Sequence, residues 1–107
     1  MGNPIRPVCL FSAQALTTSY VQSGTFDAEN FPHGVIIHLK ASGYAAYYST
    51  LAWIDPSQVE TLYSAQSLAA GATAKVVITD PWPYFAVSVK SQSTGNAGTI
   101  TVFVNAK

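Results

Sequence analysis

The chain has 107 residues, enough for one domain that buries roughly two-thirds of its unfolded surface. Only 9% of the residues are charged, 49% are hydrophobic, and five basic residues balance five acidic ones. This composition excludes a disordered chain, and it provides no positive field that would attract nucleic acid or an anionic membrane. A surface with so little charge also favours association between copies, because little repulsion keeps them apart.

The N-terminal residues 1–16 are predicted to be an extended arm of a single domain, 1–107. Pro4 and Pro7 prevent a regular strand at the start of the arm. Its apolar run, 8–11, is too short for a signal peptide, which needs a core of about 7–15 residues. No run reaches the ~18 apolar residues of a membrane span. We therefore expect synthesis in the cytoplasm without a signal peptide, and no membrane insertion.

Cys9 is the only cysteine of the chain, so an intrachain disulfide is excluded. It stands between Val8 and Leu10, where a buried small side chain is expected. The alternative is a thiol that pairs with another chain.

Most of the chain alternates apolar and polar residues, the pattern of strands with one buried face. We predict strands at residues 8–11, 17–21, 34–41, 44–54, 73–79, 84–91 and 98–105, with a polar turn region at 24–32. In the third of these segments, Val35, Ile37 and Leu39 alternate with Ile36, His38 and Lys40, and the aliphatic face of the first set should face the core. Trp53 lies on a central strand and is also expected to be buried.

Residues 55–71 fit two structures. Asp55 and Pro56 suit the cap and the first position of a helix. The same pair also suits a β-turn that joins two apolar runs into a hairpin. An amphipathic helix would continue its apolar stripe at positions 66 and 67, but Gln66 and Ser67 interrupt it. We therefore favour the hairpin.

The last third of the chain contains two alternating strands, 84–91 and 98–105, around a turn-rich stretch. We predict that they pair as an antiparallel hairpin. Two prolines around Trp82 force a loop or bulge before the first strand. With about seven or eight short strands, the fold class is predicted to be all-β, an antiparallel β-sandwich of the jelly-roll or immunoglobulin-like type. The residues expected inside are Phe85, Val87, Val89, Ile100, Val102 and Val104.

Little in the sequence supports catalysis or metal binding. No nucleophile motif such as Gly-x-Ser-x-Gly accompanies the two histidines, His33 and His38. Their odd spacing places them on opposite faces of any shared strand, which is unsuitable for joint metal ligation. Asp27 and Glu29 would project together, but we expect solvated turn carboxylates there. The sequence predicts no enzyme, no cofactor and no metal site.

Aromatic and aliphatic side chains on the loops and the arm are the candidates for partner contacts, because rigid rings bury much area at low entropic cost. Trp82 suits a partner contact and a plug at the end of the sandwich equally well. Phe103 is predicted on the outward face of its strand, which indicates either a covered sheet or a partner surface. The predicted contact residues are Ile5, Val8, Leu10, Phe11, Tyr44, Tyr47, Tyr48, Trp82, Tyr84 and Phe103.

A series of segments within residues 31–106 carries a resemblance to a known group of proteins. These segments are Gly34–Ala41, Leu51–Ser57, Glu60–Tyr63, Gly71–Ile78, Pro83–Val89 and Gly98–Val104. In their order, the chain resembles small tailed-phage virion structural proteins of the head decoration (cement) or minor capsid type. The resemblance implies a β-sandwich bound in many copies to a shell, and its motifs are structural, so it carries over no functional residue.

From this resemblance we expect a non-enzymatic protein on the capsid exterior that binds the major capsid protein and stabilises the head lattice. Self-association is also expected, with a trimer favoured, since it raises avidity. The arm at residues 1–11 is a candidate for strand addition to a neighbour, and an ordinary first strand of its own sheet is the alternative. Two other functions suit the same sandwich. One is a carbohydrate-binding module or tail-tip adhesin that stacks glycans on Trp82, Tyr84 and the 44–48 cluster, and the other is a small tail or neck assembly protein.

Overall fold

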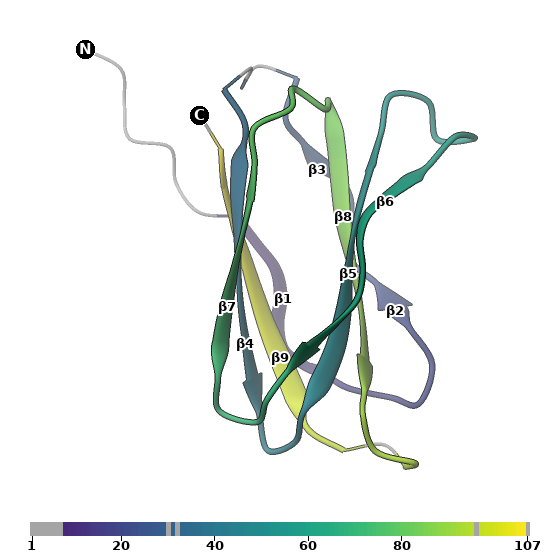
Figure 1. Ribbon diagram of the computed structural model, residues 1–107, viewed down its shortest axis with the longest axis vertical. Helices are drawn as coiled ribbons and strands as arrows, with labels where there is room; N and C mark the ends of the chain where they lie inside the picture. Colours follow the sequence, from purple (N-terminus) through teal and green to yellow (C-terminus); the bar gives the residue numbers. More distant parts are fainter. Residues whose placement is uncertain (1–7, 30, 32, 96, 107) are drawn as a thin grey trace.

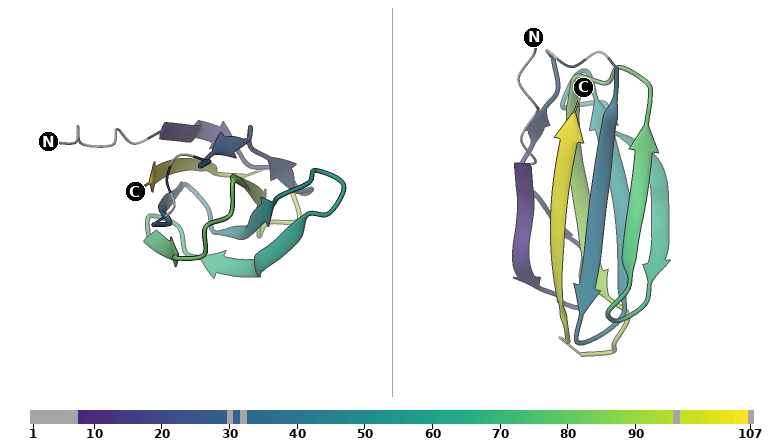
Figure 2. Two further views of the ribbon diagram at one scale, coloured as in Figure 1. Left: turned by 90° about the horizontal axis from the view of Figure 1, so that it is seen from above. Right: turned by 90° about the vertical axis from the view of Figure 1, so that its left-hand side faces the viewer.

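The computed structural model describes residues 8–29, 31, 33–95 and 97–106, and these form nine β-strands and no helix. The strands lie in two antiparallel sheets that face each other (Figure 1). Seen from above, the two layers enclose one core (Figure 2). Within these residues there is consequently no helix of the length and apolar character that crosses a membrane. The predicted all-β sandwich is confirmed.

The order of the strands is that of a jelly roll. The strands are β1 (Val8–Ala15), β2 (Val21–Gln22), β3 (Phe26–Asp27), β4 (Val35–Ser42), β5 (Ala46–Trp53), β6 (Glu60–Leu68), β7 (Thr73–Ile78), β8 (Tyr84–Ser91) and β9 (Thr99–Ala106). Sheet A has the order β1-β9-β4-β7, and sheet B has the order β2-β8-β5-β6, with β3 also on β8. Since β2 and β3 share one edge of β8, the strands occupy eight positions in two four-stranded layers, as in a jelly roll.

The predicted hairpin between β8 and β9 is wrong. β8 pairs with β2, β3 and β5 in sheet B, whereas β9 pairs with β1 and β4 in sheet A. The residues predicted inside, such as Val87 and Val102, are nevertheless fully buried. Alternation shows which face of a strand is buried but does not show which strand lies beside it. The connection at 92–98 is long enough to cross the gap of about 10 Å between stacked sheets.

The predicted hairpin within residues 55–71 is confirmed, because β5 and β6 pair with each other and no helix forms there. Asp55 organises the turn: its Oδ1 accepts hydrogen bonds from the N–H and the hydroxyl of Ser57, at 3.0 and 2.9 Å. Its carbonyl accepts a further bond from the N–H of Gln58 at 2.9 Å. These bonds from Ser57 lower the pKa of the Asp55 carboxyl.

The N-terminal part differs from the predicted arm over residues 8–15. These residues form β1, which pairs with β9 at one edge of sheet A. They are therefore a strand of their own sheet, and the predicted strand addition by this part of the arm is corrected. Ile5 and the rest of residues 1–7 lie outside the described residues. Sequence analysis also missed β3, because 24–32 has the composition of a turn although Phe26 is buried.

The core lies between the two sheets and is built from the inward residues of the long strands. Thr50 is a polar residue within this core: it is fully buried, and in the described part of the chain its Oγ1 has no hydrogen-bond partner. The largest fully buried apolar residues are Leu16, Ile37, Leu39, Phe85, Val87, Val89, Ile100, Val102 and Val104.

Candidate functional site

The predicted contact residues do not gather at one site. Phe11 and Tyr48 are only 7% and 8% exposed, because their side chains point between the sheets, so the prediction that they contact a partner is corrected. Leu10 is half-buried against the same core. The others are distributed over the molecule: Val8 and Phe103 on sheet A, Tyr47 and Tyr84 on the outer face of sheet B, and Tyr44 and Trp82 in loops at opposite ends.

Exposed apolar side chains do cluster on the outer face of sheet A. Ile36 of β4 lies beside Val77 of β7 and Asn105 of β9, and Phe103 lies one diagonal step away on β9. Val77 is 48% exposed and Phe103 is 41% exposed. Outward positions of a solvated antiparallel sheet normally carry polar residues. Apolar residues on three adjacent strands therefore form a contiguous surface, which we call the sheet A patch (Ile36, Val77 and Phe103).

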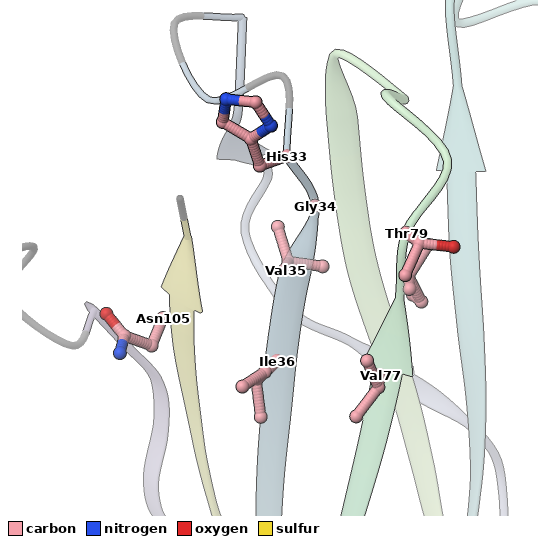
Figure 3. Close-up of a pocket in the computed structure, with 8 residues that line it drawn as sticks. His33, Gly34, Val35, Ile36, Val77, Thr79 and Asn105 are labelled. Carbon is pink, nitrogen blue, oxygen red and sulfur yellow. The ribbon is translucent and has the colours of Figure 1, made fainter.

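Two shallow hollows run along the sheet A patch and share Ile36 and Asn105. The larger, of about 330 Å³, is also lined by His38 and Phe103. The smaller, of about 160 Å³, reaches from Val77 to the end of the sheet at Thr79 and His33 (Figure 3). Together the hollows extend the patch across three neighbouring strands, β9, β4 and β7.

Gly34 holds one end of the smaller hollow together. Its φ of +103° is one that side-chain-bearing residues rarely adopt, and an added Cβ would overlap with the carbonyl oxygen of Ile78. The missing side chain lets the start of β4 approach the end of β7 closely. This contact keeps Val35 in register with Ile78, and it holds the walls of the hollow at a fixed separation.

The electrostatic character of the outer face of sheet A is weakly basic. His38, Lys40 and Lys75 project from it, and none of the five acidic residues lies in its described strands. The cross-strand neighbours of His38 are Lys75 and Phe103, so no carboxylate on these strands orients its ring for general-base catalysis. Within the described ranges, no group of three metal-ligating side chains is assembled. The arrangement offers apolar contact with a few polar groups at its margin.

The outer face of sheet B carries a second aromatic cluster. Trp53 and Tyr84 stack with their ring centroids 6.2 Å apart. The Tyr84 hydroxyl donates a hydrogen bond of 2.7 Å to Glu29 Oε1, and this bond to a carboxylate raises the pKa of Tyr84. Trp53 is only 6% exposed, so its predicted burial is confirmed, although it lies outside the core between the sheets. Tyr47 lies about 20 Å away along β5, where Lys90 Nζ is 5.6 Å from its ring centroid.

Trp82 combines the two roles considered for it. Its side chain is partly buried against the core at the end of the sandwich. It also lines an open hollow of about 220 Å³ together with Ile54, Asp80 and Pro81. Ile54 is 73% exposed, so this hollow is apolar and open, with one carboxylate at its rim.

Cys9 is exposed, which corrects the expectation of a buried side chain. It lies on the edge strand β1 opposite Phe103, and therefore on the outer face. Its thiol donates a hydrogen bond of 3.2 Å to the Phe11 carbonyl.

Sequence reasoning identified Phe103 as an outward apolar residue but did not select Ile36 and Val77. The signal was present, because both residues occupy outward positions in alternating strands, where a polar residue is expected. What the sequence lacked was the information that residues 36, 77 and 103 become neighbours.

No protein-family model and no curated protein sequence matches the chain. Several solved structures share its fold. The Yersinia pseudotuberculosis-derived mitogen YPM aligns over 96% of this chain and 87% of its own, with a TM-score of 0.59 and 6% identity. PirA aligns over 100% and 96%, with a TM-score of 0.59 and 7% identity. A Bacillus endospore appendage protein, from a family of disulfide-linked pili, aligns over 98% and 91%, with a TM-score of 0.52 and 12% identity. At these identities the likeness shows a common β-sandwich fold.

Proposed function

We propose that this protein is a non-enzymatic structural protein of a phage particle, which decorates the capsid exterior and docks on the head lattice through the sheet A patch. The observation that carries the proposal is the apolar surface formed by the exposed Val77 and Phe103 and the half-buried Ile36 on the face of a regular sheet. Contiguous exposed apolar surface of this kind marks contacts with partners more often than chance exposure does.

The mechanism is physical and not chemical. Each copy would bury the patch against neighbouring subunits of the shell, so that separating those subunits also exposes apolar surface to water. A standard interface buries roughly 1,600 Å² in total. Phe103 is its natural anchor, because a large ring that fills a groove on a partner contributes more than the polar residues around it. Self-association, for which we propose a trimer, would multiply this modest contribution by avidity.

The jelly-roll order agrees with this proposal but does not carry it. Viral capsid domains and lectins both use this order of strands, so the fold by itself admits a shell protein and a sugar-binding protein. The low charge of the chain, with five basic and five acidic residues, suits a protein that packs in many copies.

Co-sedimentation with shells assembled without this protein tests the proposal. Phe103→Glu should weaken shell binding at least about tenfold, because it places a charge at the centre of an apolar contact. Tyr20→Glu is the matched control, since Tyr20 is 41% exposed, as Phe103 is, and lies beside sheet B, with Lys90 Nζ of β8 5.1 Å from its ring centroid. Equal binding by the two variants, with both folded, would remove the sheet A patch from the docking surface.

A second function, glycan binding by an adhesin, is favoured by the hollow beside Trp82. An aromatic ring next to a carboxylate, here Trp82 and Asp80, suits a sugar ring that stacks and donates hydrogen bonds. A glycan array with the wild-type protein and with Trp82→Ala distinguishes this function. Sugar binding that depends on Trp82, together with no sedimentation with shells, would make adhesion the function.

A further inference from the structure

A polar hollow lies at the side of the sandwich where the edge strands of the two sheets meet. β6 is the edge of sheet B and β7 is the edge of sheet A, and both lie on the same side of the sandwich (Figure 2). Gln66 is the register partner of Tyr48, and Tyr63 is the register partner of Thr50. Since Tyr48 and Thr50 point between the sheets, their partners on β6 project to the same face. The hollow, which we call the side hollow, has a volume of about 210 Å³ and is lined by Tyr48, Tyr63, Gln66, Lys75, Val76 and Val77.

The hydroxyl of Tyr48 opens into the side hollow. Tyr48 is 8% exposed, and its ring packs in the core, so it offers no aromatic face to a partner. Within the described residues its hydroxyl has no hydrogen-bond partner, yet the one fully enclosed side-chain atom without a partner there is Thr50 Oγ1. The Tyr48 hydroxyl is therefore accessible from the hollow that Tyr48 lines. Burial raises the pKa of Tyr48 above its ordinary 10.0, so at neutral pH the hydroxyl keeps its proton and can donate a hydrogen bond.

The other polar side chains of the side hollow are mostly hydrogen-bond donors. Lys75 contributes an ammonium group with three N–H donors. Gln66 Nε2 donates one bond to the Ser64 carbonyl at 3.1 Å, and its second N–H and its Oε1 have no partner in the described part of the chain. Tyr63, which is 44% exposed, adds a ring and a hydroxyl. None of the described residues that line the hollow is acidic, so it suits a ligand that carries a negative charge.

The edge of β7 adds backbone groups to the same wall. Ala41 N–H donates to the carbonyl of Ala72, which continues the register between β4 and β7, at 3.2 Å. Hydrogen-bonded pairs alternate along an antiparallel ladder, so the N–H and C=O groups of Lys75 and Val77 point away from β4, towards the side hollow. These groups provide donors and acceptors that hydroxyl groups of a ligand can use.

We propose that the side hollow binds a carboxylated sugar, such as one hexuronic acid residue of an acidic glycan. The carboxylate would bind the ammonium group of Lys75 and the hydroxyl of Tyr48. The ring hydroxyls would bind Gln66 and the backbone edge of β7. The apolar C–H face of the sugar would rest on the ring of Tyr63, because the negative face of an aromatic ring attracts C–H groups. A few polar groups placed in a concave site are sufficient to orient a ligand of this size.

Methyl glucuronide and methyl glucoside, which differ in the presence of the carboxylate, test this inference. In nuclear magnetic resonance titrations of the full chain, the glucuronide should shift the amide signals of residues 63–66 and 75–77. It should bind at least about tenfold more tightly than the glucoside, because the charge-assisted contacts are absent from the glucoside. Equal affinities would overturn the proposal. So would the absence of binding at about 50 mM glucuronide, where a site of about 1 mM affinity is nearly filled. Acetate that binds as tightly as the glucuronide would also overturn it, since the site would then recognise a carboxylate and not a sugar.

Conservative variants separate the charge from the hydroxyl. Lys75→Gln should weaken glucuronide binding about tenfold and leave glucoside binding unchanged, since it removes the charge and keeps a polar side chain. Lys40→Gln is the matched control, because Lys40 is exposed on the neighbouring strand β4 but does not line the hollow. Tyr48→Phe should weaken glucuronide binding about threefold or more without lowering the melting temperature, because the hydroxyl has no partner in the described part of the protein. Tyr44→Phe is its control, since Tyr44 is 43% exposed and lies outside the hollow. Equal losses in a variant and its control would contradict the proposal.

The inference goes beyond shell docking and does not depend on it. Lys75→Gln and Tyr48→Phe leave the sheet A patch in place and should sediment with shells as the wild type does, whereas Phe103→Glu should still bind the glucuronide. The hollow beside Trp82 is also separate from the side hollow. Trp82→Ala should therefore bind the glucuronide unchanged, and glucuronide binding that required Trp82 would place the sugar elsewhere and refute the inference.

Discussion

Replacing Gly34 by alanine tests the close contact between β4 and β7 on which the smaller hollow depends. A side chain at a positive φ costs about 1–2 kcal/mol. Alanine restricts the unfolded chain more than glycine does, and this offsets about 0.4–1 kcal/mol of that cost. The new Cβ also overlaps with the carbonyl oxygen of Ile78, a backbone atom that cannot rotate away. Separating the strands there adds about 1–3 kcal/mol of packing strain and about 1 kcal/mol for a weakened hydrogen bond.

The sum predicts that Gly34→Ala lowers the free energy of unfolding by about 2–6 kcal/mol. Two other glycines separate the causes. Gly71 has a φ of +76° but open space around its Cβ position, so Gly71→Ala reports the backbone strain alone, about 1 kcal/mol. Gly24 has open space and no positive φ, and Gly24→Ala should stay within about 0.5 kcal/mol of the wild type.

Urea denaturation followed by tryptophan fluorescence measures all three variants. With a slope of about 2 kcal/mol/M, the midpoint of Gly34→Ala should fall by about 2 M relative to the wild type. A cost for Gly34→Ala no larger than that for Gly71→Ala would refute the reasoning, because it would mean that the contact with Ile78 imposes no steric limit.

Three further predictions follow from buried or hydrogen-bonded groups. Thr50→Val should raise the free energy of unfolding by about 1–2 kcal/mol, because it removes a buried hydroxyl without a partner at nearly constant volume; a lower melting temperature would contradict this. Val87→Asp should abolish the β-sheet circular-dichroism spectrum at 25 °C, since Val87 is fully buried and an unpaired charge there costs more than about 4 kcal/mol; a folded variant would contradict the position of the core. The hydrogen bond to Glu29 raises the pKa of Tyr84 above its ordinary 10.0, so the stabilisation by neutral Tyr84 is complete below that pH and is lost as the pH rises through the raised pKa. Glu29→Gln should return the absorbance titration of Tyr84 towards 10.0, and an unchanged titration would show that Glu29 does not act on it.

The sequence by itself determined the fold class and the inward face of most strands. Residues such as Ile37 and Val87 were assigned to the core because alternation is a local property, set by the direction in which successive side chains leave the backbone. The turn at Asp55 was equally local, since its hydrogen bonds join residues two and three positions apart. Side-chain alternation and local turn hydrogen bonds depend only on residues close together in the chain, so they can be read from the sequence without knowing which strands pair.

The tertiary structure alone decided which strands are neighbours. β8 and β9 have the pattern of a hairpin, yet they lie in different sheets, because each buries its apolar face equally well beside a distant strand. The same long-range pairing brings Ile36, Val77 and Phe103 together on one face. The sheet A patch arises from pairings between residues far apart in the chain, and alternation within a single strand contains no information about it.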